Sequence, residues 1–259
     1  MNRLINLNII LFSLIFLDGS CKLSLKKDLS YTPKEYRMKG MPDQDSIWTD
    51  RNYIKAYITL SKTRAGNFLS LPRKRSKKSA AIFSRIISKE NMSFLNDTAE
   101  TLSNKAFRIQ HLSSLITDVS RIYTDDLRQE QFYNEELIDL YIFRLFVQEK
   151  MLELADEIMN SKDPSVMGMR EGLIAVQQGY LNLINVLLEE QVKSNKYHSD
   201  DLERLSGEIS HSLLNNLKWM DQDSREKITN QIQRALDKSS SDLIKEDLWK
   251  TLNVFKKRP

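Results

Sequence analysis

The chain has 259 residues, of which 41% are hydrophobic and 29% charged, an ordinary balance for a soluble globular domain. Its single cysteine excludes an intrachain disulfide, and its 7 glycines and 5 prolines are too few for the frequent turns of a β-sheet domain. Charge is uneven, because residues 22–90 contain 17 Lys and Arg against 6 Asp and Glu, whereas residues 91–259 contain 21 against 28. These properties favour a helical protein with a basic N-terminal part.

The first 21 residues have the pattern of an export signal. Arg3 supplies a positive charge, and the apolar run over residues 4–17 is too short to span a bilayer but suits a signal peptide. Two small residues, Gly19 and Ser20, come directly before Cys21. This arrangement resembles the lipobox of bacterial lipoproteins, although Asp18 stands where that pattern has an aliphatic residue. The resemblance implies that residues 1–20 are removed and that Cys21 carries acyl chains such as palmitate.

Two other interpretations of this leader stay open, an ordinary cleaved signal and an uncleaved anchor. The leader contains no A-x-A-like cleavage site, which disfavours the first of them. Two or more acyl chains hold a protein stably on a membrane, since each buried CH₂ contributes about 0.8 kcal/mol. We therefore expect a lipid-anchored protein of a bacterial envelope, in the outer membrane and facing the cell surface.

Residues 21–46 lack an apolar period and mix six Lys and Arg with Ser, Pro and Gly. Such a segment cannot bury enough apolar surface to order itself, so we predict a disordered tether. Its cations would lie close to the headgroups of the membrane. Residues 47–259 then form the folded domain.

Apolar residues recur at intervals of three and four through the rest of the chain, which predicts an all-α bundle of six to eight amphipathic helices. In the first helix, capped by Asp50, we expect one face to turn inward, consisting of Tyr53, Ile54, Tyr57, Ile58 and Leu60. The other helices are expected over residues 79–89, 93–123, 126 or 134–160, 165–194, 199–220, 223–238 and 243–255. The segment 165–194 is the most apolar, so we expect it to be central.

Residues that could carry catalysis are sparse. His111, His198 and His211 have no ligand partners at metal spacing, and no nucleotide-binding or nucleophile motif is present. We expect the remaining candidate carboxylates to be solvated helix faces; these are Glu149, Glu153, Glu157, Glu189 and Glu190. The sequence therefore predicts no enzyme, no cofactor, no metal and no nucleic-acid partner.

A Gly-x-x-x-Gly pattern at Gly168 and Gly172 has two interpretations. It indicates either close packing between soluble helices or a chance match.

Five cations in six positions form the basic segment, which consists of Arg73, Lys74, Arg75, Lys77 and Lys78. Pro72 should end the preceding helix, and no acidic residue lies between Arg51 and Glu90, so nothing nearby in the sequence neutralises the segment. The pattern is similar to short heparin-binding clusters. We predict a site for a sulfated glycan or anionic lipid; the alternative is a solubilising loop.

A lipobox-like leader, a lysine-rich tether and a helical domain together resemble the all-helical surface lipoproteins of spirochaetes, at the level of the class. That resemblance implies a non-enzymatic protein that binds a host ligand, such as a complement component, fibronectin or a glycosaminoglycan-bearing proteoglycan. The alternative is a periplasm-facing lipoprotein with a structural or envelope-assembly role.

The leader generates a direct prediction. Cells that express the chain should incorporate a fatty-acid analogue into it, and Cys21→Ala should abolish the incorporation because the acceptor thiol is lost. Metabolic labelling followed by immunoprecipitation measures this. Equal labelling of both chains would contradict lipidation at Cys21.

Overall fold

The computed structural model describes residues 39–77, 79–124, 132–192 and 196–257. The predicted signal peptide, Cys21 and the tether up to residue 38 lie outside the described residues. The described part contains eight α-helices joined by short 3₁₀ segments and no strand, so the predicted all-α bundle of six to eight helices is confirmed.

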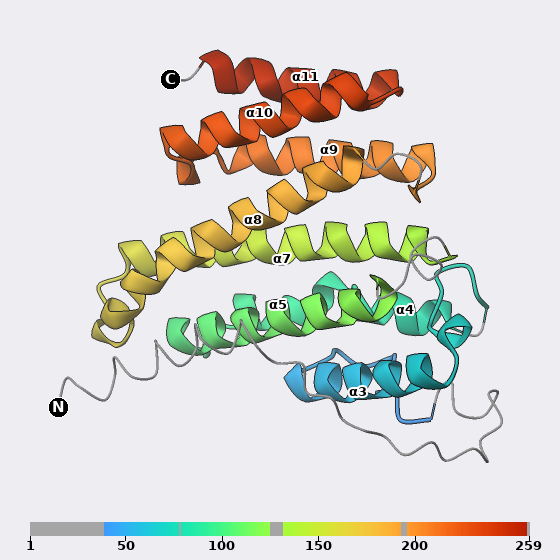
Figure 1. Ribbon diagram of the computed structural model, residues 1–259. Coiled ribbons are helices and arrows are strands. Elements are labelled where there is room, and N and C mark those ends of the chain that lie inside the picture. The colour runs from blue at the N-terminus through green and yellow to red at the C-terminus, as the bar shows by residue number, and fades with distance from the viewer. Residues whose placement is uncertain (1–38, 78, 125–131, 193–195, 258–259) are drawn as a thin grey trace. The chain divides into compact units, whose positions relative to one another are not determined.

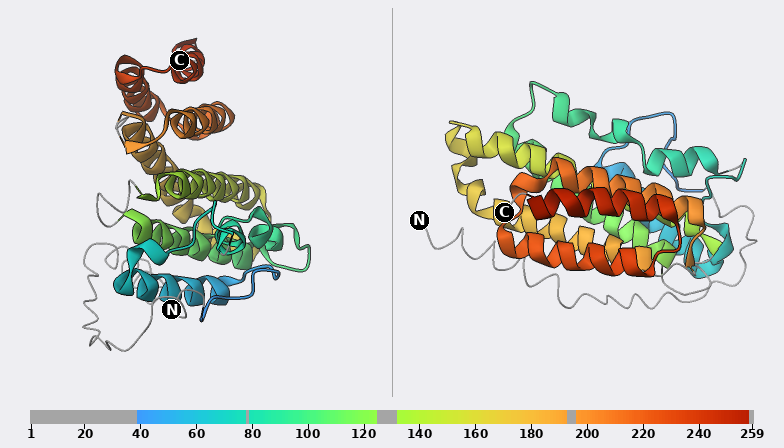
Figure 2. Two further views of the ribbon diagram at one scale, coloured as in Figure 1. Left: turned by 90° about the vertical axis from the view of Figure 1, so that its right-hand side faces the viewer. Right: turned by 90° about the horizontal axis from the view of Figure 1, so that it is seen from above.

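The helices are α3 (Asp50–Gly66), α4 (Ala80–Ile86), α5 (Leu102–Thr124), α7 (Asn134–Asn160), α8 (Leu173–Val192), α9 (Ser199–Asn215), α10 (Gln222–Lys238) and α11 (Asp242–Lys257). The long helices pack mainly on helices one or two places away in the chain (Figures 1 and 2). Thus α3 contacts α5, α5 contacts α7, and α7 contacts α8 and α9. At the other end of this series, α10 packs on α8, α11 packs on α9, and α10 and α11 pack on each other.

The central helix is α7 rather than the predicted segment 165–194. Leu137, Ile138 and Leu140 on successive sides of α7 are fully buried, because α5, α8 and α9 all pack against this helix. In contrast, α8 keeps one side in solvent, where Ile174 is 74% exposed. The mean apolarity of a segment therefore did not identify the most enclosed helix.

Two predicted helices begin later than expected. Residues 89–96 form a 3₁₀ segment, and the Asp97 carboxylate accepts a hydrogen bond from the Ala99 amide at 2.9 Å, which competes with helical bonding. Thr101 then caps α5 by accepting a hydrogen bond from the Asn104 amide at 3.2 Å. Likewise Pro164–Gly172 is a 3₁₀ segment, and α8 starts only at Leu173.

The glycines of the Gly-x-x-x-Gly pattern lie in that second 3₁₀ segment. Added side chains at Gly168 and Gly172 would meet nothing within 4 Å. The pattern therefore does not mark close helix packing.

The inward face of α3 agrees with the prediction at Tyr53 and Leu60 and differs from it at Ile54 and Ile58. Tyr53, Ala56 and Leu60 are buried, whereas Ile54 and Ile58 are 40% and 45% exposed. The buried face is hard to recognise in the sequence because it includes two polar residues, Thr59 and Thr63. Both can face inward because their hydroxyls donate to helix carbonyls one turn back, at 2.9 Å.

The segment before α3 lies against the domain. Gly40 adopts a positive φ of 103°, and a Cβ there would come within 3.1 Å of the Thr59 hydroxyl oxygen. The indole Nε1 of buried Trp48 donates to the Asp43 carbonyl at 2.7 Å, and Arg85 donates to the Gln44 carbonyl. The part of the predicted tether that is described, residues 39–46, therefore lies against α3 at Gly40 and bonds to α4 at Gln44.

The inward face of α3 can be tested by truncating one residue on each side. Leu60→Ala should lower the free energy of unfolding by about 2–5 kcal/mol, because it leaves a cavity in the core. Ile58→Ala should change it by less than about 0.5 kcal/mol. Urea unfolding followed by circular dichroism measures both. A larger loss for Ile58→Ala than for Leu60→Ala would place the wrong face inward.

Candidate functional site

The basic segment is a fixed connection between α3 and α4. The Tyr123 hydroxyl donates to the Pro72 carbonyl at 3.0 Å, and the Arg73 amide donates to the Ser79 hydroxyl at 3.0 Å. The Ser76 amide donates to the Arg73 carbonyl at 3.2 Å, which closes a tight turn. These bonds hold the backbone in one place and so decide where its cations point. Of the five, Lys78 lies outside the described residues.

Arg73 lies on the aromatic residues that precede α7. Its guanidinium carbon is 4.2 Å from the centroid of the Phe132 ring and 5.7 Å from that of Tyr133. It donates to the Phe132 carbonyl at 3.3 Å, and its Nε lies 3.9 Å from the Glu136 carboxylate. Arg73 is therefore an anchor for the start of α7 as well as a charge.

Lys74 and Arg75 pair with carboxylates on the first turns of α7. The Lys74 ammonium lies 3.0 Å from Asp139 and 3.5 Å from Glu135, and its backbone amide donates to Glu136 at 2.8 Å. The Arg75 Nε lies 2.8 Å from Glu135, although its side chain is 81% exposed. Three of the five cations therefore have intramolecular carboxylate partners.

The carboxylates of this network are the more buried partners. The side chains of Glu136 and Asp139 are 1% and 6% exposed, and Arg204 of α9 also pairs with Asp139. Burial raises the pKa of Glu136, while the Lys74 amide and Arg73 act in the opposite direction. The network thus joins the basic segment to α7 and α9. Its cations also offset the free-energy cost of burying the two carboxylates, which would be high without partners.

No acid close in sequence neutralises the basic segment, but residues about 60 to 65 positions later in the chain supply acids that pair with it. Only Lys77, among its described cations, is exposed without a described ion-pair partner. Binding of a polyanion by Arg73, Lys74, Arg75, Lys77 and Lys78 stays a prediction. The geometry assigns the first three a structural role.

An exposed cationic surface that the sequence analysis missed lies on α3. We call it the α3 outer face, and it consists of Arg51, Ile54, Lys55, Ile58 and Lys62, all exposed. The three cations fall within about 40° of one another around the helix axis, at 3.6 residues per turn. None has an ion-pair partner among the described residues. The spacing of these cations, four and then seven residues, places them on one side of a helix and could have revealed this face. The sequence analysis did not identify it because it expected Ile54 and Ile58, which lie beside the cations, to be buried.

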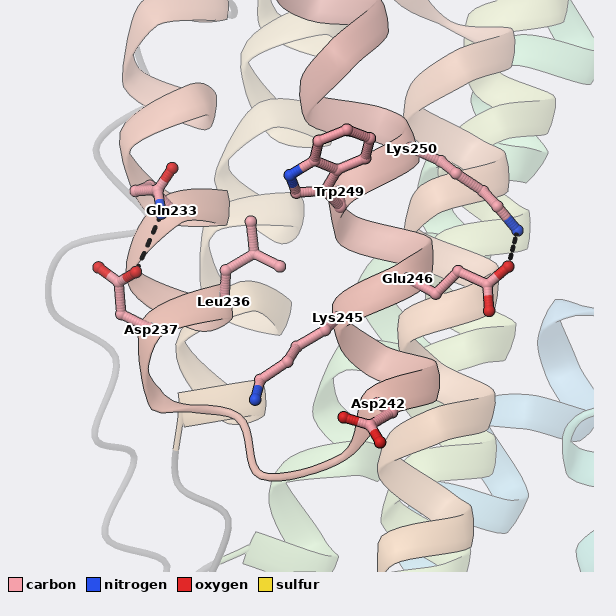
Figure 3. Close-up of a pocket in the computed structure, with 8 residues that line it drawn as sticks. All are labelled: Gln233, Leu236, Asp237, Asp242, Lys245, Glu246, Trp249 and Lys250. Atoms are coloured by element: carbon pink, nitrogen blue, oxygen red, sulfur yellow. Dashed lines mark hydrogen bonds and ion pairs between the residues drawn. The ribbon is translucent and has the colours of Figure 1, made fainter.

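A groove of about 580 Å³ separates α10 from α11 (Figure 3). Leu236 forms its floor, and Trp249, 60% exposed, stands on one wall. The Lys250 ammonium lies 2.6 Å from Glu246 and lowers the pKa of that carboxyl. An acid with a lowered pKa stays ionised at neutral pH, so Glu246 is unsuited to proton donation.

Two carboxylates expected on solvated faces are partly or fully buried. Burial raises the pKa of Glu149, although a hydrogen bond from Ser212 on α9 opposes the shift. Glu190 is 6% exposed and accepts a hydrogen bond from the Tyr197 hydroxyl at 2.5 Å. Glu149 contacts a residue of α9, whereas Glu190 is covered by Lys196 and Tyr197 in the connection that follows α8. The helix-face interpretation was therefore wrong for these two carboxylates.

The histidines are separate from one another in their contacts. His111 Nδ1 lies 3.1 Å from an Asp50 oxygen, and His211 contacts Asn215 one turn later. Among the described residues, no three His, Cys, Asp or Glu side chains are grouped as metal ligands. The helices of the described part also include none with the length and apolarity needed to cross a bilayer.

Comparisons of the chain with protein-family models, curated proteins and solved structures give no significant match.

The ion-pair network predicts that Lys74 contributes more than Lys77 to the free energy of unfolding. Lys74→Met should lower the free energy of unfolding by about 1–3 kcal/mol, because one oxygen of the buried Asp139 carboxylate loses its partner. Lys77→Met removes the same charge from an exposed position and should cost less than about 0.5 kcal/mol. Chemical denaturation at low and high salt measures both. Equal costs would show that Lys74 is only a surface cation.

Proposed function

We propose that the chain is a lipid-anchored, non-enzymatic binding protein of a bacterial envelope, and that the α3 outer face rests on anionic lipid headgroups. The leader that ends at Cys21 supports the anchor. The observation that carries the second part is the α3 outer face itself, which combines three exposed cations with two exposed isoleucines and no acid.

Chain order places α3 nearest the anchor of all the described helices. Gly40, where the described contacts with the domain begin, comes 19 residues after Cys21. Even a fully extended chain of that length spans only about 65 Å. The domain therefore stays close to the membrane that holds its acyl chains, and a surface of α3 can reach the headgroups.

The chemistry of the α3 outer face favours lipid over a sulfated glycan. Cations near an anionic membrane contribute about 1 kcal/mol each. Exposed isoleucines beside those cations gain further when they enter the apolar boundary of the headgroup region, as on interfacial amphipathic helices. A soluble glycan offers no such apolar phase. Ile54 and Ile58 therefore favour an anionic membrane over a sulfated glycan as the partner of this face.

This arrangement leaves the surfaces remote from α3 free for a ligand, which favours a host- or surface-ligand-binding role. A periplasm-facing structural role is the alternative. Proteolysis of intact cells separates the two, since only a surface-exposed domain is cut.

The α3 outer face predicts preferential binding to anionic vesicles. Replacing Arg51, Lys55 and Lys62 with Gln in the full chain should weaken binding to vesicles rich in anionic lipid by roughly a hundredfold at low salt. The difference should shrink as salt rises, because exposed charges are screened over about 8–10 Å. Cosedimentation with anionic and zwitterionic vesicles measures this. The leader is the same in both chains, so the difference between lipids isolates α3.

A matched control replaces three exposed cations of α10 and α11, namely Arg234, Lys238 and Lys256, with Gln. This variant has the same net charge as the α3 variant and should bind like the wild type. Equal weakening in both variants would indicate a response to net charge alone and would refute the assignment to α3. Loss of heparin retention without loss of vesicle binding would identify a sulfated glycan instead.

A further inference from the structure

A second, smaller cleft lies between α5, α7 and α8, on a different part of the domain from the α3 outer face. Its volume is about 160 Å³. Ser113 of α5, Arg144 and Gln148 of α7, and Gly179 and Asn182 of α8 line it. Most of these residues are polar, which is unusual for a space between packed helices and is not required by the fold.

Arg144 is the charged group of this cleft, and it has no anionic partner. No described residue forms an ion pair or hydrogen bond with its guanidinium. Its guanidinium carbon lies 6.0 Å from the centroid of the Tyr141 ring, which carries no full negative charge at neutral pH. Burial lowers the pKa of Arg144, Tyr141 opposes this shift, and the positive charge of nearby Arg121 adds to it. Arginine nevertheless stays charged at neutral pH. A partly buried cation without a counter-charge is costly, so an anion that enters the cleft would offset that cost.

Gln148 adds a second unsatisfied group. Its Nε2 donates to the Ser113 hydroxyl oxygen at 3.0 Å, but its Oε1 is buried and has no hydrogen-bond partner. A buried acceptor without a partner costs free energy that a donor on a ligand would recover.

Gly179 keeps space open beside this oxygen. A Cβ at position 179 would lie 3.7 Å from Gln148 Oε1. The glycine therefore gives a ligand access to the acceptor.

From these groups we infer that the cleft binds a small carboxylate that carries its own hydrogen-bond donor, such as a hydroxy acid or an amino acid. The carboxylate pairs with the fork of N–H donors on Arg144, and the donor of the ligand reaches Gln148 Oε1. A water molecule occupies about 30 Å³ in the liquid, so the cleft suits a molecule of roughly five to eight non-hydrogen atoms. This inference does not depend on the lipid anchor.

The test uses the full chain purified in detergent and three probes of similar size. Glycolate has a carboxylate and a donor, acetate has the carboxylate alone, and ethylene glycol has donors without charge. Isothermal titration calorimetry should show that glycolate binds most tightly, that acetate binds more weakly, and that ethylene glycol does not bind. Inorganic phosphate is the fourth probe; if it binds and glycolate does not, the carboxylate assignment is wrong.

Arg144→Gln should weaken glycolate binding at least about tenfold, because a charge-assisted hydrogen bond is lost. Arg234→Gln removes the same charge from an exposed position on α10 and should leave binding unchanged. Glycolate should also raise the melting temperature of the wild type and of Arg234→Gln, but not that of Arg144→Gln, since a ligand stabilises the state that binds it. Unchanged binding in Arg144→Gln would overturn the proposal.

Gly179→Ala tests the site with a substitution that should not destabilise the fold. The new methyl group makes only ordinary contacts, and alanine is the better helix former, so this variant should be at least as stable as the wild type. It should nevertheless bind glycolate more weakly because the methyl group narrows access to Gln148. Full retention of binding, or the absence of glycolate binding to the wild type at tens of millimolar, would refute the site.

Discussion

The pairing of the basic segment with the first turns of α7 is the constraint on which the rest of this domain depends. Glu136 and Asp139 are buried, and buried carboxylates are tolerated only when cations and hydrogen-bond donors compensate them. Lys74 and Arg73 provide that compensation from the connection between α3 and α4, and Arg204 provides it from α9. The same contacts therefore position α7 among its neighbours. They also neutralise most of the positive charge that the sequence alone suggests is available to bind a polyanion.

Once these cations are paired internally, the surface available to a polyanion changes. The α3 outer face retains three cations without carboxylate partners among the described residues, and Ile54 and Ile58 stand beside them. Position in the chain, positive charge and exposed apolar side chains all support the contact with anionic lipid that we propose for this face. Charge density along a sequence is thus a poorer guide to a binding surface than the charge left after tertiary ion pairs form.

The helical class, the approximate helix positions and most core stripes could be predicted from periodicity, because α7, α9, α10 and α11 repeat their apolar residues over several turns. The late starts of α5 and α8 could not, since they depend on the local bonds of Asp97 and on a 3₁₀ segment. The exposure of Ile54 and Ile58 on α3 was missed because the inward face includes Thr59 and Thr63, whose hydroxyls bond to carbonyls of their own helix. The partners of the basic segment, and the lack of a described ion-pair partner at Arg144, depend on which residues far apart in sequence come together, and no single-sequence pattern contains that information.

The most direct test of the central claim is to measure how fast individual lysines of the folded chain react with an amine-specific acylating reagent. Lys77, Lys55 and Lys62 are exposed and lack described ion-pair partners, whereas Lys74 lies 3.0 Å from Asp139. Peptide mapping by mass spectrometry should show Lys74 reacting several-fold more slowly than Lys77 at low salt, because the Lys74 amino group is held against Asp139 and Glu135 and is less accessible to the reagent. Equal rates at Lys74 and Lys77 would contradict the internal pairing of the basic segment.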